Sequence, residues 1–253
     1  MINRFEVDYA RFNALKTVAT ATPSAFEHIR FGDLYVTRDQ ARSDSYYNRI
    51  LGLTKASTPG LNDALSWIHD DTEPQSSVRV DVEAQSDVGD TLRHLGFQNV
   101  DTLIWLHAVS SAPGQDPYSG EPDSRRPRLL TTVDWPALRR LLEGHGPIAD
   151  VVWNDKRIHF CTDTFRWFGI FDGHRLVSAA SIWITGSDAI LGSAFTVPDW
   201  RGQGCQLRLL HARRRLTPGT LFVDVAPDST SYRNCVRAGF TDLDYRQIWI
   251  RQP

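Results

Sequence analysis

An internal repeat is the feature of this sequence that most constrains its fold. Residues 78–82 (VRVDV) resemble residues 221–225 (LFVDV), and residues 92–97 (LRHLGF) resemble residues 235–240 (CVRAGF) at the same offset along the chain. The register holds through a strand-like segment, a helix-like segment and a Gly-Phe pair. Similarity that persists through several elements predicts two copies of one supersecondary unit.

The sequence between the two copies has a different character. Residues 112–127 (APGQDPYSGEPDSRRP) are rich in proline and acidic residues and show no apolar periodicity, which is typical of a linker. A chain of 253 residues is long enough for one small domain on each side of it. We therefore expect one domain over residues 1–111 and a second over residues 128–253.

The composition excludes several classes of protein. A formal net charge of −2 gives no reason to expect nucleic acid or an anionic membrane as a partner. No apolar run approaches the ~18–20 residues of a membrane-spanning helix, and the first residues lack the apolar core of a secretory signal. The three cysteines suit neither a disulfide framework nor a metal site. We expect a cytoplasmic protein without a metal cofactor.

Apolar periodicity predicts the elements of each half. In the second half, strands are expected at residues 167–171, 176–184, 189–197, 221–226 and 245–251, and helices at residues 202–216 and 229–238. In the first half, strands are expected at residues 47–51, 78–82 and 102–108, and helices at residues 5–18, 23–29, 61–68 and 87–95. This order predicts an α/β (α+β) fold in which helices cover a mixed sheet.

Two glycines stand at the expected start of the helix over residues 202–216, in the segment Arg201-Gly202-Gln203-Gly204. Glycine lets the backbone approach a ligand closely, and the first N–H groups of a helix have no partner within it. Together with the positive end of the helix dipole, these groups form a site for an anion such as a pyrophosphate. The alternative is a glycine-rich turn that serves only the fold.

Residues 197–206 (VPDWRGQGCQ) resemble the R-x-x-G-x-G/A acyl-CoA signature of the GNAT acetyltransferase superfamily. Residues 231–240 (SYRNCVRAGF) resemble its second motif, a helix that ends in Gly-Phe, and one expected strand separates the two motifs as in that superfamily. The first half keeps the strand, helix and Gly-Phe but lacks Arg-Gly-x-Gly. The chain thus resembles tandem GNAT proteins with a degenerate first half. Each of its two GNAT-like domains would be a mixed, mostly antiparallel sheet flanked by helices.

The resemblance implies a site for acetyl-CoA or coenzyme A in the second half. The strand that ends at residues 195–197 would splay from the strand 221–226 and pair with the pantetheine arm, while the loop amides would hold the pyrophosphate. The developing oxyanion would be held by a backbone N–H of the same strand. The cofactor-binding residues so implied are Phe195, Thr196, Val197, Arg201, Gly202, Gln203, Gly204, Cys205, Gln206, Leu207, Ser231 and Asn234.

Three features depart from the superfamily pattern. Gln206 stands where glycine or alanine is usual, so its side chain either narrows the loop or points away from it. Cys235 stands where a tyrosine often protonates the leaving thiolate; Tyr232 is the other candidate acid, and a buried packing role is the alternative for Cys235. The usual glutamate base is absent. Asp224 matches Asp81 of the degenerate half, which favours a structural role, so we assign no base.

Two further segments of the second half bear on ligand binding. Residues 213–215 (RRR) are interpreted as a solvent-exposed helix face, with contact to the 3′-phosphate of coenzyme A as the alternative. Residues 165–168 (FRWF) lie beside the cleft in which the superfamily binds its acceptor, so they either belong to the core or favour an apolar or aromatic acceptor. The acceptor pocket itself would be built by weakly patterned segments such as residues 138–164.

The resemblance implies an N-acyltransferase that moves an acyl group, most simply acetyl, from coenzyme A directly to an amine of a small molecule or to an amino terminus. One alternative is a non-catalytic acyl-CoA sensor or scaffold, which the missing tyrosine and glutamate favour. Another is an acyltransferase with a hydroxyl acceptor or a carrier-protein donor. The expected partner is a small-molecule amine, and the sequence does not decide whether the chain forms a homodimer.

Overall fold

A computed structural model describes residues 2–16, 25–69, 77–83, 85–110, 118, 125–157 and 160–252. The chain divides into two compact units, Met1–Ile104 with Asp244–Pro253, and Trp105–Leu243. The last strand of the chain therefore lies mainly in the first unit, from Asp244 onward. The strand that ends the first half of the sequence belongs to the second unit from Trp105 onward. These bounds differ from the expected domains 1–111 and 128–253. Most of the expected linker, residues 112–127, lies outside the described residues.

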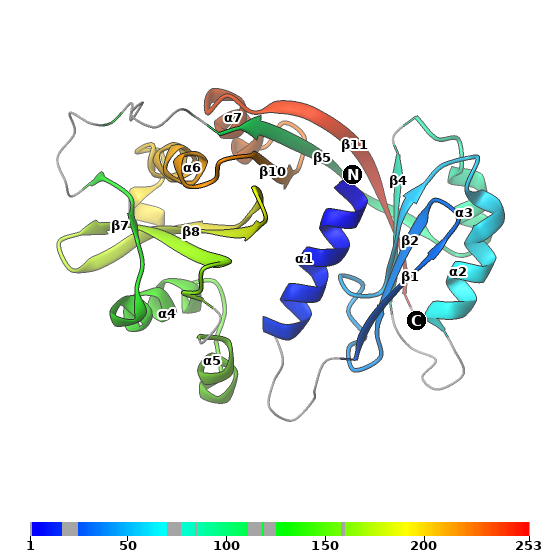
Figure 1. Cartoon of the computed structure of the whole chain (residues 1–253), viewed down its shortest axis with the longest axis horizontal. Helices are drawn as coiled ribbons and strands as arrows, with labels where there is room; N and C mark the ends of the chain where they lie inside the picture. Colours follow the sequence, from blue (N-terminus) through cyan, green and yellow to red (C-terminus); the bar gives the residue numbers. More distant parts are fainter. Residues whose placement is uncertain are drawn as a thin grey trace. The chain divides into compact units, whose positions relative to one another are not determined.

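The first unit contains a sheet with helices on both faces (Figure 1). Its strands are β1 (Phe26–Phe31), β2 (Leu34–Asp39), β3 (Arg49–Leu53), β4 (Val78–Glu83) and, from Asp244 onward, β11 (Thr241–Arg251). The pairs β1–β2, β2–β3 and β4–β11 are antiparallel, whereas β3 and β4 run parallel. One face packs against α1 (Ile2–Lys16), and the other is covered by α2 (Leu61–Ile68) and α3 (Gly89–His94).

The core of the first unit follows from the alternation of side chains along its strands. Val78, Val80 and Val82 of β4 are fully buried and pack in one cluster with Leu61 of α2 and Trp249 of β11. Successive residues of a strand point to opposite faces, so the residues between these valines point toward α1.

A group of buried charges occupies that second face. Glu6 of α1 pairs with Arg49, with 3.0 Å between Oε1 and Nη2, and with Arg246. Arg79 donates from Nη2 to Oδ2 of Asp81 at 2.7 Å. Burial by itself would raise the pKa of Asp81, but the adjacent Arg79 lowers it below its usual range. Each buried carboxylate thus has a guanidinium partner, without which its burial would be strongly destabilising.

The second unit is built around the strand order β5–β10–β9–β8–β7–β6. These strands are β5 (Gln98–Val109, in this unit from Trp105), β10 (Thr220–Val225), β9 (Asp188–Thr196), β8 (Arg175–Thr185), β7 (Phe165–Asp172) and β6 (Arg128–Leu129). β9 and β10 are parallel, and the pairs from β9 to β6 are antiparallel. One face carries α4 (Trp135–Glu143), which α5 (Asp150–Arg157) follows, and the other carries α6 (Cys205–Leu216) and α7 (Thr230–Arg237) (Figure 1). β8 is buried along most of its length because helices cover both faces.

The mixed sheets with flanking helices confirm the expected fold class. The helix expected at residues 23–29 is wrong, because β1 begins at Phe26 and pairs with β2 along its whole length. β1 is mostly exposed, so it lacks the buried alternation by which a strand is recognised in a sequence. Among the described α-helices and strands, β2, β6, α4 and α5 have no counterpart among the elements expected from the sequence. Within the described ranges, no helix is long and apolar enough to cross a membrane.

Candidate functional site

β9 and β10 separate after a short parallel pairing. Ala189 pairs with Leu221 and Ile190 with Phe222, and no further pair joins the two described strands. The rest of β9, as far as Thr196, continues to pair with β8 on its other side. The expected splay of this strand is therefore present. A free strand edge of this kind can accept the polar backbone of an extended ligand.

β9 carries a bulge within the separated stretch. Ala180 of β8 faces Ala194 of β9, whereas Ile182 faces Leu191, so β9 has an extra residue across this step. A bulge turns backbone groups out of the regular ladder. Ser193 and Ala194 are exposed. Their amides are thus placed at the edge that the separation of the strands opens.

The turn from β9 into α6 depends on two glycines. Gly202 and Gly204 have φ angles of +75° and +77°, a region that other residues rarely adopt. Gly204 is the N-cap of α6, and a Cβ there would lie 2.7 Å from Nη1 of Arg208. Arg208 donates from the same nitrogen to the carbonyl of Gln203 at 2.7 Å. Glycine conformation and this hydrogen bond together fix the shape of the loop.

Six consecutive backbone N–H groups, at residues 202–207, have no partner among the described residues. The amide of Arg201 bonds to Pro198 O, and the amide of Arg208 bonds to Gly204 O. The amides in between, at residues 202–207, have no acceptor among the described residues. Since they lie at the N-terminus of a twelve-residue helix, they form a row of donors at the positive end of its dipole.

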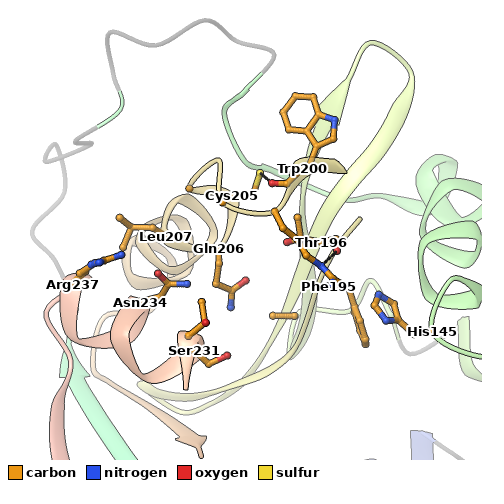
Figure 2. Close-up of a pocket in the computed structure, with 15 residues that line it drawn as sticks. His145, Phe195, Thr196, Trp200, Cys205, Gln206, Leu207, Ser231, Asn234 and Arg237 are labelled. Carbon is orange, nitrogen blue, oxygen red and sulfur yellow. Dashed lines mark hydrogen bonds between the residues drawn. The ribbon is translucent and has the colours of Figure 1, made fainter. Parts of the chain in front are cut away.

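The loop borders a cavity of about 620 Å³ inside the second unit, and Figure 2 shows it between β9, the start of α6 and α7. Most of the binding residues expected from the sequence line this cavity. They are Phe195, Thr196, Arg201, Gly202, Gly204, Cys205, Gln206, Leu207, Ser231 and Asn234. Val197 and Gln203 do not line it: the Val197 amide bonds to Val177 O at 2.9 Å, and the Gln203 side chain donates to Asp199 O at 2.9 Å.

The side chain of Gln206 points into this cavity. Figure 2 shows it reaching into the space between β9 and the α7 residues Ser231 and Asn234. The orientation of α7 is set by its N-cap, where the Ser229 side chain accepts a hydrogen bond from Tyr232 N at 3.0 Å. The unusual glutamine therefore adds an amide to the wall of the cavity.

The cavity is electropositive. Arg201 and Arg237 line it, and both are exposed. Arg201 donates from Nε to Thr196 O at 3.3 Å, and neither arginine has an acidic partner among the described residues. No aspartate or glutamate is among the described residues that line the cavity. With the helix dipole, these two charges favour an anionic ligand.

An aromatic wall closes the cavity on the side of α4. The ring of His145, in the loop after α4, lies 4.6 Å from the ring of Phe195. Phe195 stacks on the buried Trp167 at 6.4 Å, and the edges of Phe165 and Phe160 contact Trp167 from behind. The buried indole Nε1 of Trp167 has no hydrogen-bond partner among the described residues. The expected aromatic segment thus belongs to the core but also supports one wall of the cavity.

The two acids expected from the sequence do not line the cavity. Cys235 is 2% exposed, and burial raises the pKa of its thiol to about 11, which makes it a weaker acid. Tyr232 donates its hydroxyl to Asp242 at 3.2 Å. Asp224, which was weighed as a base, is exposed and also lies outside the cavity lining. These positions favour a packing role for Cys235.

The expectation of a solvent-exposed face at residues 213–215 is wrong for Arg213. This side chain is 1% exposed, and burial lowers its pKa to about 10. It donates from Nε to Leu209 O at 3.1 Å and from Nη1 to Ser181 O at 3.0 Å. Two carbonyls thus satisfy the guanidinium between α6 and β8, so Arg213 cannot contact a ligand.

Several lining residues were missed. Arg237 follows Asn234 by one helical turn within the recognised motif, so helical spacing could have found it. Trp200 lies within the first motif, Thr230 directly precedes the second, and Ala194 lies in the expected strand 189–197. His145 comes from a loop without apolar pattern, and no sequence signal marks it.

Comparisons with known proteins agree with this geometry. No protein-family model matches the sequence, and no curated protein matches it. Solved structures do match. A GCN5-related N-acetyltransferase from Sphaerobacter thermophilus is 15% identical with a TM-score of 0.63, over 88% of this chain and 82% of that one. A GCN5-related N-acetyltransferase from Kribbella flavida is 12% identical with a TM-score of 0.61, over 97% and 95% of the two chains.

A tandem GNAT protein from the clavulanic acid biosynthesis pathway also matches, at 16% identity and a TM-score of 0.51, over 96% of this chain and 87% of that one. The chain therefore has the GNAT fold. This match covers nearly the whole chain.

Proposed function

We propose that this chain is an acyl-CoA-dependent N-acyltransferase that moves an acyl group, most simply acetyl, directly to an amine. The observation that carries the proposal is the separation of β9 from β10 beside the unpaired amides of residues 202–207. A free strand edge and a row of helix N-terminal donors meet in one cavity. These are the two features that an extended pantetheine arm and a pyrophosphate need.

Three parts of the donor would have partners in this cavity: the pyrophosphate, the pantetheine arm and the acyl group. The loop amides would bind the pyrophosphate, with charge-assisted contacts from Arg201 and Arg237. The pantetheine arm would lie along β9, where Gln206 and Asn234 offer polar side chains on the opposite wall. The acyl group would then reach the bulge next to Ala194.

The reaction needs no covalent intermediate on the protein. The amine lone pair attacks the thioester carbon, and the carbonyl electron pair moves to oxygen. That pair re-forms the C=O bond as the C–S bond breaks with its pair on sulfur. The amine gives up an N–H proton, and the thiolate gains one directly or through water. The amides at the bulge of β9 would stabilise the developing oxyanion. The protein's contribution is mainly to hold donor and acceptor in a reactive arrangement.

A non-catalytic acyl-CoA sensor is the second candidate. It is favoured by one observation: no aspartate, glutamate or tyrosine is among the described residues that line the cavity. A sensor would bind the donor as tightly as an enzyme but would not pass the acyl group to an acceptor.

Turnover separates the two candidates. The purified protein is incubated with acetyl-CoA and a panel of primary amines, amino acids and short peptides, and released coenzyme A is measured with a thiol reagent. The proposal predicts amine-dependent release together with an acetylated product in the mass spectrum. Tight binding of acetyl-CoA without release for any acceptor would favour the sensor. Failure to bind acetyl-CoA would overturn both.

A further inference from the structure

The cavity has a feature that the donor does not use. Among the described residues that line it, His145 alone carries an imidazole, the side chain that most often serves as a general base in enzymes. The others are small, apolar or amide side chains, hydroxyls, two arginines and the thiol of Cys205, whose pKa burial raises. An amine that attacks a thioester must lose a proton, so a base at this place has a defined task.

His145 also approaches the cavity from the side that the donor leaves free. It lies in the loop that joins α4 to α5, whereas the loop amides and α7 form the other walls (Figure 2). Its neighbour on β9 is Phe195, which follows Ala194 at the bulge. A base next to this strand would face an acceptor that enters along the α4 side of the sheet.

The His145 ring packs against Phe195 and leaves its nitrogens without a described hydrogen-bond partner. Its backbone amide bonds to Leu142 O at 2.9 Å, and its ring packs on the ring of Phe195 at 4.6 Å and an interplanar angle of 42°. No described residue forms a hydrogen bond or ion pair with either ring nitrogen. His145 is thus exposed and in contact with Phe195, and both ring nitrogens are available to a substrate.

The charges around His145 are few. On its own turn, Glu143 is engaged by Arg139, with 2.7 Å between Oε1 and Nε. The facing element β9 presents the uncharged Phe195. Across the cavity lie Arg201 and Arg237, which the proposed function assigns to the donor's phosphates. No carboxylate among the described lining residues competes for the proton.

We infer that His145 is a catalytic residue that takes the proton from the acceptor amine as the amine attacks the thioester. The N–H electron pair stays on nitrogen as the new C–N bond forms, and the proton moves to a ring nitrogen of His145. The C–S pair leaves on sulfur, and the thiolate then regains a proton from the imidazolium or from water. The inference rests on the proposed function, since it needs a bound acyl donor.

The test compares His145→Ala and His145→Gln with His174→Ala. His174 is an exposed histidine in the turn between β7 and β8, and it is not among the residues that line this cavity. Binding of acetyl-CoA is measured by calorimetry and amine-dependent coenzyme A release by a thiol reagent. Both His145 variants should bind acetyl-CoA as the wild type does and lose about 10²- to 10⁴-fold in kcat. His174→Ala should change neither quantity.

Two further readouts separate proton transfer from mere packing. Added imidazole should restore part of the activity of His145→Ala but not of His145→Gln, whose side chain fills the space. In both variants the loss should lie in kcat, while KM for the amine stays within about 3-fold of wild type. Turnover within about 3-fold of wild type in His145→Ala, or no turnover by wild-type protein that binds acetyl-CoA, would overturn the inference. If the wild type does not bind acetyl-CoA, the proposed function itself fails.

Discussion

Ile190 of β9 and Phe222 of β10 form the last parallel pair between these strands before they separate. In the first unit, the corresponding strands β3 and β4 stay paired as far as Leu53 and Val82. The two parallel strands of the repeated unit are therefore separated in the second copy and paired in the first. Because the donor needs the open edge, the first unit lacks the gap in which the second would bind it.

The loop before α6 should tolerate no side chain at Gly204. Gly204→Val places a β-branched residue at φ +77° and a Cβ against Arg208, which displaces the amides of residues 202–207. Affinity for acetyl-CoA should fall by at least about 10-fold, or ~1.4 kcal/mol, in calorimetry. Gly186→Val is the matched control, because Gly186 has φ +59° but lies in the β8–β9 turn with open space around it. Equal affinities in the two variants would contradict the role of the loop.

The charge of Arg237 should contribute to binding of the donor. Arg237→Ala removes a guanidinium from the cavity wall, and affinity for acetyl-CoA should fall by roughly 5- to 10-fold, about 1 to 1.4 kcal/mol, at low salt. The difference should shrink as salt rises, because the charge is exposed. Arg233→Ala serves as the control, since Arg233 lies on the same helix and donates to Asp228 O. A loss of the same size in both variants would show that the position of the charge is irrelevant.

The thiol of Cys235 should be unreactive in the folded protein and should take no part in turnover. Because burial raises the pKa of this thiol to about 11, the thiolate is scarce at pH 8, and iodoacetamide should leave Cys235 unmodified in the folded protein until the pH nears that value. Cys235→Ala should keep amine-dependent turnover within about 3-fold of wild type, since the cavity lies elsewhere. Rapid labelling at pH 8 or a loss of about 100-fold in kcat would instead restore a chemical role for Cys235.

The pair of Asp134 and Arg128 should make the second unit sensitive to acid. Arg128 donates two hydrogen bonds to Asp134, at 2.8 and 2.6 Å, and lowers its pKa below the usual range. A carboxyl whose pKa is depressed by folding stabilises the fold above its unfolded pKa of ~3.9 and loses this contribution as the pH falls. Asp134→Asn should therefore lower the free energy of unfolding by ~1 kcal/mol at pH 7.

Urea unfolding at several pH values checks this expectation. The difference between wild type and Asp134→Asn should narrow as the pH approaches about 3.5. Asp172→Asn, at an exposed aspartate that ends β7, should show no such dependence. A difference for Asp134→Asn that is the same at pH 7 and pH 3.5 would rule out the ion pair as its cause.

Features of the fold that depend on local chemistry were predictable from the sequence. Gly202 and Gly204 were expected at the start of a helix, and α6 begins at Cys205 directly after them. Gly239, expected to follow the end of the helix over residues 229–238, has φ +82°. In each case the signal and its structural consequence lie within a few residues of one another.

Features that depend on contacts between residues far apart in the chain were not predictable from the sequence. β1 is recognisable as a strand only through its pairing with β2. The C-terminal strand β11 pairs with β4 of the first half. The repeat in the sequence does not show that a strand from the end of the chain joins the sheet of the first unit. The sequence predicts that Arg213 lies on the surface, because the buried carbonyl of Ser181 that accepts its hydrogen bond is far away in the chain. His145 reaches the cavity only because the fold brings its loop to Phe195.

Calorimetric titration of the purified chain with acetyl-CoA tests the central claim most directly. The open strand pair in the second unit and the closed pair in the first predict one site per chain, with a dissociation constant in the micromolar range, about −8 kcal/mol. Affinity should fall by at least about 10-fold in Gly204→Val and be kept in Gly186→Val. No detectable binding by the wild type, or two equivalent sites per chain, would contradict the account.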